Sequence, residues 1–333
     1  MTTVSIPHEQ RTAQEPRQNT LYKVRLSKIT NANPTVRLLR LAVGSALSSE
    51  QEGDCKSNNP AQLAPFHFLP GQWLDVHVPS VERAGGFTIT STPQDAQQLS
   101  LESNEKEPYV ELAIQDSPSS PPAAWLWRPE NEILGQELGV RVGGSFTWPP
   151  PDTPPEEIER AVFVAGGVGI NPLISMLSHI FQNPSTLPHS PPIHLLYSTR
   201  LPTTPTQGED ISNHLNQVLF LPRLRNIMKF QQQQNQALRL HLHIFITNLP
   251  KTPCNPPPDF ALHDRRITMA DLRDVVCGRK DAAKSGGGPS GDRTVCYVCG
   301  PPNMTDEFVA GIEGLLGPAE KGRGKRVFCE KWW

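Results

Sequence analysis

"VFVAGGVGINPLISML", Val162 to Leu177, decides how the second half of this chain is interpreted. An apolar run leads into Gly166, Gly167 and Gly169, and a segment of helical character follows directly. Glycines let the backbone approach a pyrophosphate closely, and a helix N-terminus offers unpaired N–H groups with a partial positive charge. The stretch therefore predicts a phosphate-binding turn of a dinucleotide site, with a tight turn that binds nothing as the alternative.

The helix after this turn is expected to begin with Asn171 as its N-cap and Pro172 at its first position, since both residue types are favourable there. We assign cofactor binding to the whole turn, which comprises Gly166, Gly167, Val168, Gly169, Ile170, Asn171 and Pro172.

The pattern of apolar residues differs between the two sides of residues 151–160. Residues 161–333 contain "AVFVA", "IHLLYST", "LHLHIFIT" and "TVCYVC", buried parallel-strand patterns that alternate with helical segments, which predicts an α/β domain. Residues 21–150 contain short alternating runs such as "QWLDVHV" and "LGVRVGGSF", typical of an antiparallel barrel or sandwich. The proline-rich residues 151–160 predict a stiff linker.

Several stretches have a composition that cannot bury a core. We expect a disordered tail over residues 1–20 and loop insertions at 44–64, 201–208, 231–236 and 279–292.

The overall composition excludes several classes of protein. The 333 residues carry a formal net charge of −2 without a basic run, so neither nucleic acid nor an anionic membrane is an expected partner. No stretch approaches the ~20 apolar residues of a membrane span, and the first residues lack the apolar core of a secretory signal. Six scattered cysteines suit a reducing compartment. We expect an intracellular protein that is not secreted, and a monomer.

A second signal is "VCYVCGPPNMTDEF", Val295 to Phe308. The strand ends at Cys299, which places this thiol at the carboxyl edge of the sheet, where such folds bind ligands. Cys296 and Cys299 form a CxxC, but residues three apart on a strand point to opposite faces and cannot form a disulfide. Cys299 is a candidate contact to a nicotinamide, and a purely structural cysteine is the alternative.

The end of the second α/β strand, "YSTR", is expected near the adenosine ribose of a dinucleotide. Ser198 and Arg200 are suited to a 2′-phosphate, which favours NADPH, although a strand-end arginine is often only solvated. His241 and His243 share one face of a predicted strand, but no third ligand is evident, and we predict no metal site.

The motifs "PGQW", "GFTITS", "AGGVGINP" and "CGPPNM", in this order, resemble the ferredoxin–NADP reductase superfamily. "VRVGGSF", "GGVGINPL" and the terminal "EKWW" are similar to a branch of it that is associated with mitochondria. The resemblance implies a six-stranded Greek-key flavin barrel followed by a five-stranded parallel sheet for the pyridine nucleotide. It implies FAD and NAD(P) as cofactors, and it suggests the mitochondrion as the compartment, with the cytoplasm as the alternative.

The same resemblance implies roles for individual residues. Phe87 would stack on the flavin, and Thr88 would hydrogen-bond its N5. Thr88, Cys299 and Glu330 are the residues expected at the reacting atoms, and a terminal aromatic is expected to cover the flavin ring. The alternatives are a packing role alone for Phe87 and Thr88, a plain surface carboxylate for Glu330, and a terminal tail that is merely packed or left loose. The remaining nucleotide contacts implied are Gly300, Pro301 and Met304, and the covering aromatics are Trp332 and Trp333.

The chain departs from the superfamily at the flavin phosphates. The arginine that pairs with them is replaced by Gly85, and Arg83 is the only candidate substitute we identify. The second phosphate-binding stretch maps onto "SSPPAAWLW", where Ser120 and Ala123 take the places of a glycine and a serine. FAD is therefore expected to be held weakly.

Two functions follow from these observations. The first is a flavin-dependent oxidoreductase that moves electrons from NAD(P)H through a flavin to an unknown acceptor. The second is an NAD(P)H-binding module of reductase fold that has lost flavin and acts as a sensor or regulator. An iron–sulfur fusion is disfavoured, because no C-x₄-C-x₂-C spacing occurs among the cysteines.

Overall fold

The computed structural model describes residues 7–43, 65–97, 107–203, 210–249, 258–278, 293–318 and 324–331. The chain divides into two compact units, unit 1 (Met1–Thr30 and Arg37–Ser145) and unit 2 (Asn31–Val36 and Phe146–Trp333). The expected insertions at 44–64 and 279–292, and most of 201–208, lie outside the described residues. Among the described helices, none has the length and apolar character needed to cross a membrane.

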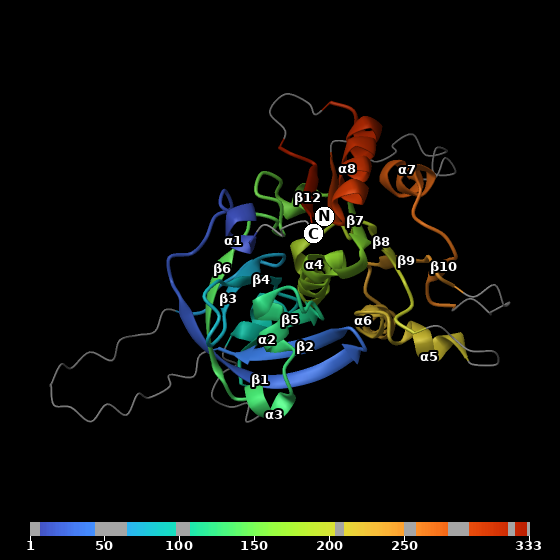
Figure 1. Ribbon diagram of the computed structural model, residues 1–333. Coiled ribbons are helices and arrows are strands. Elements are labelled where there is room, and N and C mark those ends of the chain that lie inside the picture. The colour runs from blue at the N-terminus through green and yellow to red at the C-terminus, as the bar shows by residue number, and fades with distance from the viewer. Residues whose placement is uncertain are drawn as a thin grey trace. The chain divides into compact units, whose positions relative to one another are not determined.

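Unit 1 contains a six-stranded antiparallel sheet with the order β4-β3-β6-β1-β2-β5 (Figure 1). The chain just after β4 returns to β5 through a bridge between Ile89 and Leu112, which joins the two ends of the sheet into a barrel. The predicted antiparallel barrel is thereby confirmed. Its strands are β1 (Tyr22–Asn33), β2 (Val36–Ala42), β3 (Trp73–His77), β4 (Gly85–Thr88), β5 (Tyr109–Gln115) and β6 (Glu137–Gly143), and its short helices are α1 (His8–Arg11), η1 (Pro93–Ala96), α2 (Pro121–Leu126) and α3 (Glu130–Ile133).

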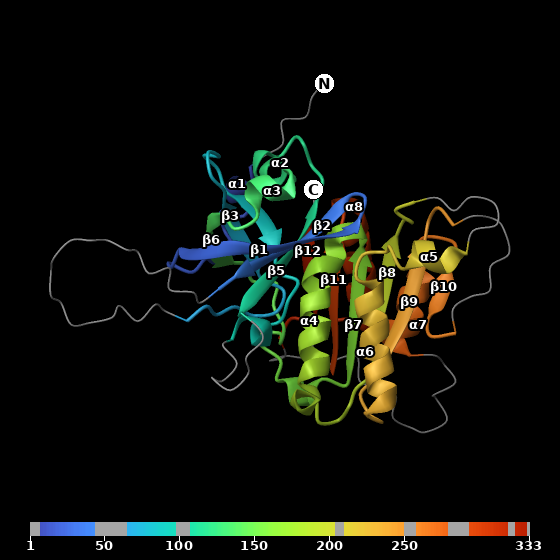
Figure 2. The same ribbon diagram turned by 90° about the horizontal axis from the view of Figure 1, so that it is seen from below.

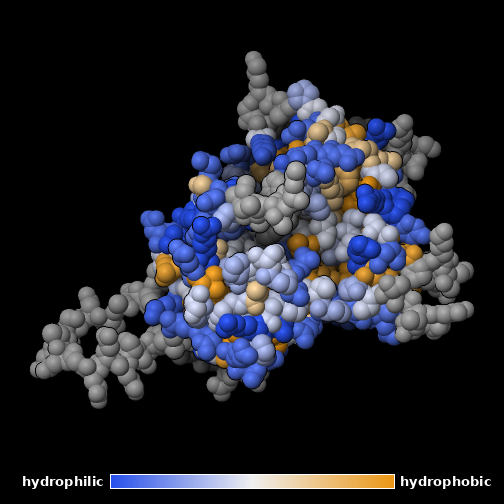
Figure 3. Space-filling view, in the orientation of Figure 1, coloured by the Kyte–Doolittle hydropathy of each residue, from blue (hydrophilic) through white to orange (hydrophobic). Residues whose placement is uncertain are grey.

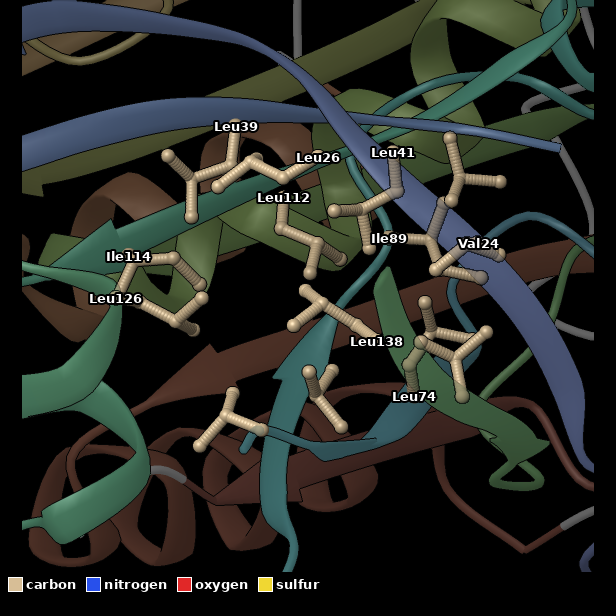
Figure 4. Close-up of a cluster of buried hydrophobic side chains, with 14 of the residues drawn as sticks. Val24, Leu26, Leu39, Leu41, Leu74, Ile89, Leu112, Ile114, Leu126 and Leu138 are labelled. Carbon is tan, nitrogen blue, oxygen red and sulfur yellow. The ribbon is translucent and has the colours of Figure 1, made fainter. Parts of the chain in front are cut away.

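Alternation along strands such as β6 builds part of the barrel core, whereas β3 and β5 bury consecutive residues. In β6, the side chains of Leu138, Val140 and Val142 are buried, while the residues between them face outward or lie half-buried. Figure 4 shows the inward side chains of neighbouring strands meeting at the centre, with Leu26, Leu74 and Leu112 among them. Burying a leucine of this kind contributes about 1.5–3 kcal/mol, so the interior fixes which face of each strand points inward.

The segment before β1 is docked on the barrel from Pro7 onward, which differs from the disordered tail expected over residues 1–20. Arg17 donates from its Nε to Asp75 Oδ2 at 2.8 Å and lies over the Trp73 ring, and His8 Nε2 is 3.2 Å from Asp75 Oδ1. A Cβ on Gly86 would lie 2.0 Å from the His8 ring, so this ring fills the space beside the glycine. Such docking depends on tertiary partners, and composition alone does not reveal it.

Asp75 is the carboxylate that contacts both Arg17 and His8 of this segment. Burial by itself raises the pKa of the Asp75 carboxyl, but the hydrogen bonds and charges of His8 and Arg17 outweigh burial and leave the pKa below its usual value. A carboxyl with a depressed pKa stabilises the fold above its unfolded pKa of about 4, and this stabilisation is lost as the pH falls through the folded value.

We expect Asp75→Asn to lower the free energy of unfolding by about 2 kcal/mol at neutral pH, because it removes a buried, charge-assisted contact. It should also expose Arg11 and Arg17 to trypsin. The control is Glu137→Gln, whose exposed pair with Lys23 should contribute less than about 1 kcal/mol. Denaturant unfolding and timed proteolysis measure both effects. If Asp75→Asn and the control behave alike, the segment is not held by Asp75.

Unit 2 contains a six-stranded parallel sheet with the order β10-β9-β8-β7-β11-β12. The α/β class is confirmed, but the five strands expected are wrong: six occur within the described residues. The three-residue strand β10 and the terminal strand β12 lack an apolar run that sequence patterns can identify. The strands are β7 (Arg160–Gly166), β8 (Ile193–Thr199), β9 (Leu240–Ile246), β10 (Ala261–His263), β11 (Thr294–Gly300) and β12 (Val327–Lys331).

Helices cover both faces of this sheet. Figure 2 shows α4 and α6 side by side on one face, and the core of the other face joins side chains of β7, β11, α7 and α8. The helices are α4 (Ile170–Gln182), α5 (Ile211–Leu215), α6 (Leu221–Gln233), α7 (Met269–Cys277) and α8 (Pro302–Leu316), and the short 3₁₀ turns are η2 (Pro155–Glu157), η3 (Gly167–Gly169) and η4 (Pro184–Thr186).

The prediction of a loop insertion at 231–236 is wrong for its first three residues, because α6 continues to Gln233. Gln231 is buried, and its Oε1 accepts a hydrogen bond from the Leu240 N–H at 3.3 Å. Glutamine is a good helix former, so a run of glutamines with low complexity was compatible with a helix end.

The surface drawn in Figure 3 is mostly hydrophilic, with apolar side chains in small groups. Four large apolar side chains are exposed within the described residues: Leu21, Leu69, Leu134 and Phe230. Single exposed leucines are ordinary in folded proteins and indicate no interface by themselves.

Candidate functional site

The glycine turn lies between β7 and α4, at the carboxyl edge of the parallel sheet (Figure 1). Gly167 has a φ of +55°, and a Cβ built there would meet no described atom within 4 Å. Gly169 is different, since its Cβ would lie 2.2 Å from the carbonyl oxygen of Cys299. Gly167 therefore faces open space, whereas Gly169 is required for the turn to pack on β11.

The helix after the turn does not start where the sequence suggested. A 3₁₀ turn over Gly167–Gly169 leads into α4, whose first residue is Ile170, with Gly169 at the cap. Asn171 and Pro172 lie inside the first turn of the helix and are buried, so the expected N-cap role of Asn171 is wrong. The early start is possible because Pro172, which has no N–H to donate, still falls within the first turn.

The end of β11 lies beside the glycine turn. Ala165 pairs in register with Cys299, so the predicted thiol lies at the carboxyl edge and is fully buried. Cys296 belongs to the core shared with α7 and α8, and alternation turns Cys299 to the opposite face. Neither Cys296 nor Cys299 belongs to a disulfide, in agreement with the spacing argument.

Met304 packs over two glycines of neighbouring strands. A Cβ on Gly166 would lie 2.7 Å from the Met304 sulfur, and a Cβ on Gly300 would lie 2.3 Å from its Cε. Pro301 precedes α8, where its missing N–H costs no helical bond. Met304 thus closes the gap between the ends of β7 and β11, a packing role that the motif alone did not indicate.

Glu330 pairs in register with Cys299, across β12 and β11. The next residue, Lys331, lies 2.6 Å from an oxygen of Asp306 on α8, which raises the pKa of the lysine. The structure therefore brings Glu330, Cys299 and the glycine turn to one edge of the sheet. Trp332 and Trp333 lie outside the described residues.

Ser198 and Arg200 follow at the end of β8. Ser198 pairs with Gly166 of β7, so it is next to the turn in register, and Arg200 is exposed two residues later. The loop beyond is fixed by Asn248, whose side chain accepts from the Leu201 N–H at 2.7 Å and donates to the Leu201 carbonyl at 3.2 Å. Sequence reasoning missed Asn248, because it belongs to another strand end.

The flavin-related residues lie in unit 1. Phe87 and Thr88 form the end of β4; Phe87 is half-buried, and Thr88 is buried with no hydrogen-bond partner for its Oγ1 among the described residues. The place of the missing arginine is filled: a Cβ on Gly85 would lie 2.6 Å from Phe87 Cε2 and 2.7 Å from Pro122 Cβ. Arg83 is exposed.

The second expected phosphate contact also fails to form an anion site. Ser120 precedes α2 without a side-chain capping bond, and Pro121 and Pro122 have no N–H to offer. The Ala124 N–H donates to the Ser120 carbonyl at 2.8 Å, and Ala123 is buried. The residues present therefore do not fit the diphosphate of a resident FAD.

The histidines form a stack rather than a metal site. His194 stacks on His241 with ring centroids 4.8 Å apart, and His243 lies 6.3 Å from His194. Burial, helped by the charges of neighbouring histidines and Arg160, lowers the pKa of His194 to about 3, so its ring stays neutral. Within the described part of the chain no group of His, Cys, Asp or Glu is arranged to hold a metal ion.

A flavin-type antiparallel barrel joined to a parallel sheet with a glycine turn defines the ferredoxin–NADP reductase class. Solved structures share this fold: the CS-b5R domains of human Ncb5or in the NAD⁺ form (TM-score 0.60, 17% identity, 94% of this chain and 71% of that chain) and a cytochrome P450 reductase of Amycolatopsis (TM-score 0.58, 16% identity, 95% and 70%). No family model matches the chain.

Among curated proteins, "Oxidoreductase NAD-binding domain-containing protein 1" of Xenopus laevis is 30% identical over 335 residues, covering 98% of this chain and 84% of the relative. The human protein of that name is 28% identical over 332 residues, with coverage of 98% and 84%. The reductase component of propane 2-monooxygenase from Rhodococcus jostii is 26% identical, covering 82% of this chain and 58% of that protein. This chain belongs to the family of oxidoreductase NAD-binding domain-containing protein 1, which confirms the resemblance.

Proposed function

We propose that this chain is an NAD(P)H-dependent oxidoreductase that binds the nucleotide at the carboxyl edge of the unit 2 sheet. The observation that carries the proposal is the open space at Gly167, beside the buried packing of Gly169 on β11. Glycine at this position lets a ligand approach the backbone closely, because a Cβ here would meet no described atom within 4 Å. The similarity to reductase components supports the same reaction class.

The role proposed for each residue follows from its position along the carboxyl edge of the unit 2 sheet. The turn from Gly166 to Pro172 is proposed to receive the pyrophosphate, with Ser198 and Arg200 on the adenosine side. Cys299, Gly300 and Pro301 are proposed to lie at the nicotinamide, with Glu330 next to Cys299 in register. The nicotinamide supplies a hydride, and these residues orient it and exclude water, so no side-chain acid or base is required.

The acceptor is proposed to be a flavin, and beyond it an electron-accepting partner of the kind that a reductase component serves. Two structural neighbours are described with bound FAD, a flavohemoglobin from Malassezia yamatoensis and a reductase from Neisseria gonorrhoeae. Trp332 and Trp333 stay a prediction as a cover for the flavin ring. A monomer, and a mitochondrial compartment with the cytoplasm as the alternative, are likewise proposals.

The alternative function is an NAD(P)H-binding module without flavin chemistry. It is favoured by one observation, the filled space beside Gly85. Purified protein mixed with NADPH and free flavin separates the two: the oxidoreductase consumes NADPH, whereas the module binds it and leaves it reduced.

For the nucleotide preference, we expect Arg200→Ala to weaken NADPH binding by roughly tenfold and to leave NADH within about twofold, because a charge-assisted contact to a 2′-phosphate is lost. The control is Arg273→Ala, which removes an exposed arginine on α7. Calorimetric titration of both nucleotides measures the effect. Equal losses for NADH and NADPH, or no loss for either, would show that Arg200 does not contact the 2′-phosphate.

A further inference from the structure

We propose that flavin is an exchangeable substrate of this protein, recognised by its ring system and not by its phosphates, so that riboflavin, FMN and FAD serve alike. This inference rests on the proposed function and names the substrate class of the same site. It arises from the disagreement between the residues of unit 1 and the diphosphate of a resident FAD.

The first support is that the space for a phosphate-binding side chain is occupied. At Gly85 the ring of Phe87 and the Cβ of Pro122 stand where a side chain would begin, at 2.6 and 2.7 Å from a Cβ. An arginine at this position could be accommodated only if Phe87 and Pro122 moved.

The second support is the chain that leads into α2. Two prolines at its start remove N–H donors, and the Ala124 N–H is used within the helix. The only charged residue from Gln115 to Trp127 is Asp116, an exposed carboxylate that repels a phosphate. This stretch therefore supplies no positive charge, and two of the backbone N–H groups that a helix start normally offers are missing.

The third support concerns Arg17. This arginine hydrogen-bonds Asp75 of β3, the strand that pairs with β4. Asp75 pairs with Gly86 in register, and Arg17 is held by Asp75 at 2.8 Å and by the Thr12 carbonyl at 2.7 Å. A guanidinium bound on both sides by this chain is not available to a phosphate. The docked N-terminal segment thus uses the cation for its own attachment.

The side chains at the end of β4 are suited to contact the ring system of a flavin. Phe87 presents a half-buried aromatic side chain, and the Thr88 Oγ1 is buried without a hydrogen-bond partner among the described residues. A buried hydroxyl without a partner is costly, and a ring nitrogen would satisfy it. Stacking and one hydrogen bond act on the isoalloxazine, which riboflavin, FMN and FAD share.

The reaction is balanced with free flavin as the co-substrate. NAD(P)H loses two electrons and one hydrogen as a hydride, which forms a bond to N5 of the oxidised flavin. The flavin takes one proton from water at N1. The products are NAD(P)⁺ and dihydroflavin, which then dissociates and carries the electrons to an acceptor.

The test compares three flavins as substrates for protein that has been passed through gel filtration. Because a phosphate contact would be worth roughly ten- to a hundredfold in affinity, its absence predicts KM values for riboflavin, FMN and FAD within about fivefold of one another. NADPH consumption gives the KM values, and the absorbance of the protein after filtration gives retained flavin, expected to be negligible. Stoichiometric retained FAD, or a KM for FAD far below that for riboflavin, overturns the inference.

A gain-of-function variant checks the cause. Pro121 is exposed at the start of α2, so Pro121→Arg adds a cation and an N–H where a phosphate would lie. It should lower the KM of FMN and FAD by roughly tenfold and leave riboflavin unchanged. The control Pro121→Gln adds the backbone N–H and a long side chain without the charge, and it should change little. An equal effect of Pro121→Arg on all three flavins contradicts the inference.

A separate titration with NADPH, without flavin, distinguishes a failure of the proposed nucleotide binding from a failure of the flavin inference. If NADPH does not bind, the proposed function is wrong and the inference fails with it. If NADPH binds but no flavin is reduced, the inference is wrong while nucleotide binding stands.

Discussion

A Gly167→Asp variant is expected to bind NADH and NADPH at least about a hundredfold more weakly than the unmodified protein. Two like charges about 4 Å apart in a partly buried site repel by about 4 kcal/mol, and the introduced carboxylate would face the pyrophosphate. The side chain has room, because a Cβ at this position meets no described atom within 4 Å. The loss should therefore come from charge and not from misfolding.

The control for this variant is Gly167→Asn, which has the same shape without the charge. Asn and Asp both tolerate a left-handed backbone such as the φ of +55° found here, so both variants should fold with similar stability. Calorimetric titration compares them. Equal affinities of the Asp and Asn variants would mean that no phosphate lies at the turn.

The second large effect concerns stability. Gly169→Val should lower the free energy of unfolding by about 3 kcal/mol or more, because its Cβ would collide with the Cys299 backbone at 2.2 and 2.5 Å and neither strand end can move freely. The motif suggests that Gly169 serves backbone approach to a phosphate, but the structure assigns it to packing. A loss of nucleotide binding in this variant would therefore not report on the phosphate site.

Gly314→Ala is the matched control. It lies in α8, exposed, and its Cβ would meet no described atom within 4 Å, so the change should add about 0.5–1 kcal/mol through helix propensity. Denaturant unfolding of both variants measures the contrast. A Gly169→Val protein as stable as the unmodified chain would refute the close packing of the turn on β11.

The two-domain fold could be predicted from the sequence because its signals are local. Alternation along β6 identified a barrel strand, and the buried run ending at Gly166 identified β7 and the turn after it. The opposite directions of Cys296 and Cys299 followed from strand periodicity alone. Such features need no knowledge of what packs against them.

The remaining errors depend on partners that are distant in sequence. In the docked residues 7–19, Arg17 hydrogen-bonds Asp75, which lies 58 positions later in the chain. The filled space at Gly85 depends on Pro122, thirty-seven positions later in the chain. Short strands such as β10 form because neighbours pair with them, and a three-residue stretch carries no periodicity of its own.

Hydrogen–deuterium exchange with and without saturating NADPH, in the absence of flavin, tests the central claim most directly. Nucleotide bound at the carboxyl edge of unit 2 should slow exchange in peptides that cover Gly166–Leu173 and Cys299–Met304, while peptides from the barrel strands β1 and β2 stay unchanged. Slowed exchange in both unit 2 segments is the result that the account predicts. Unchanged exchange there, with NADPH demonstrably bound, would place the nucleotide elsewhere and contradict it.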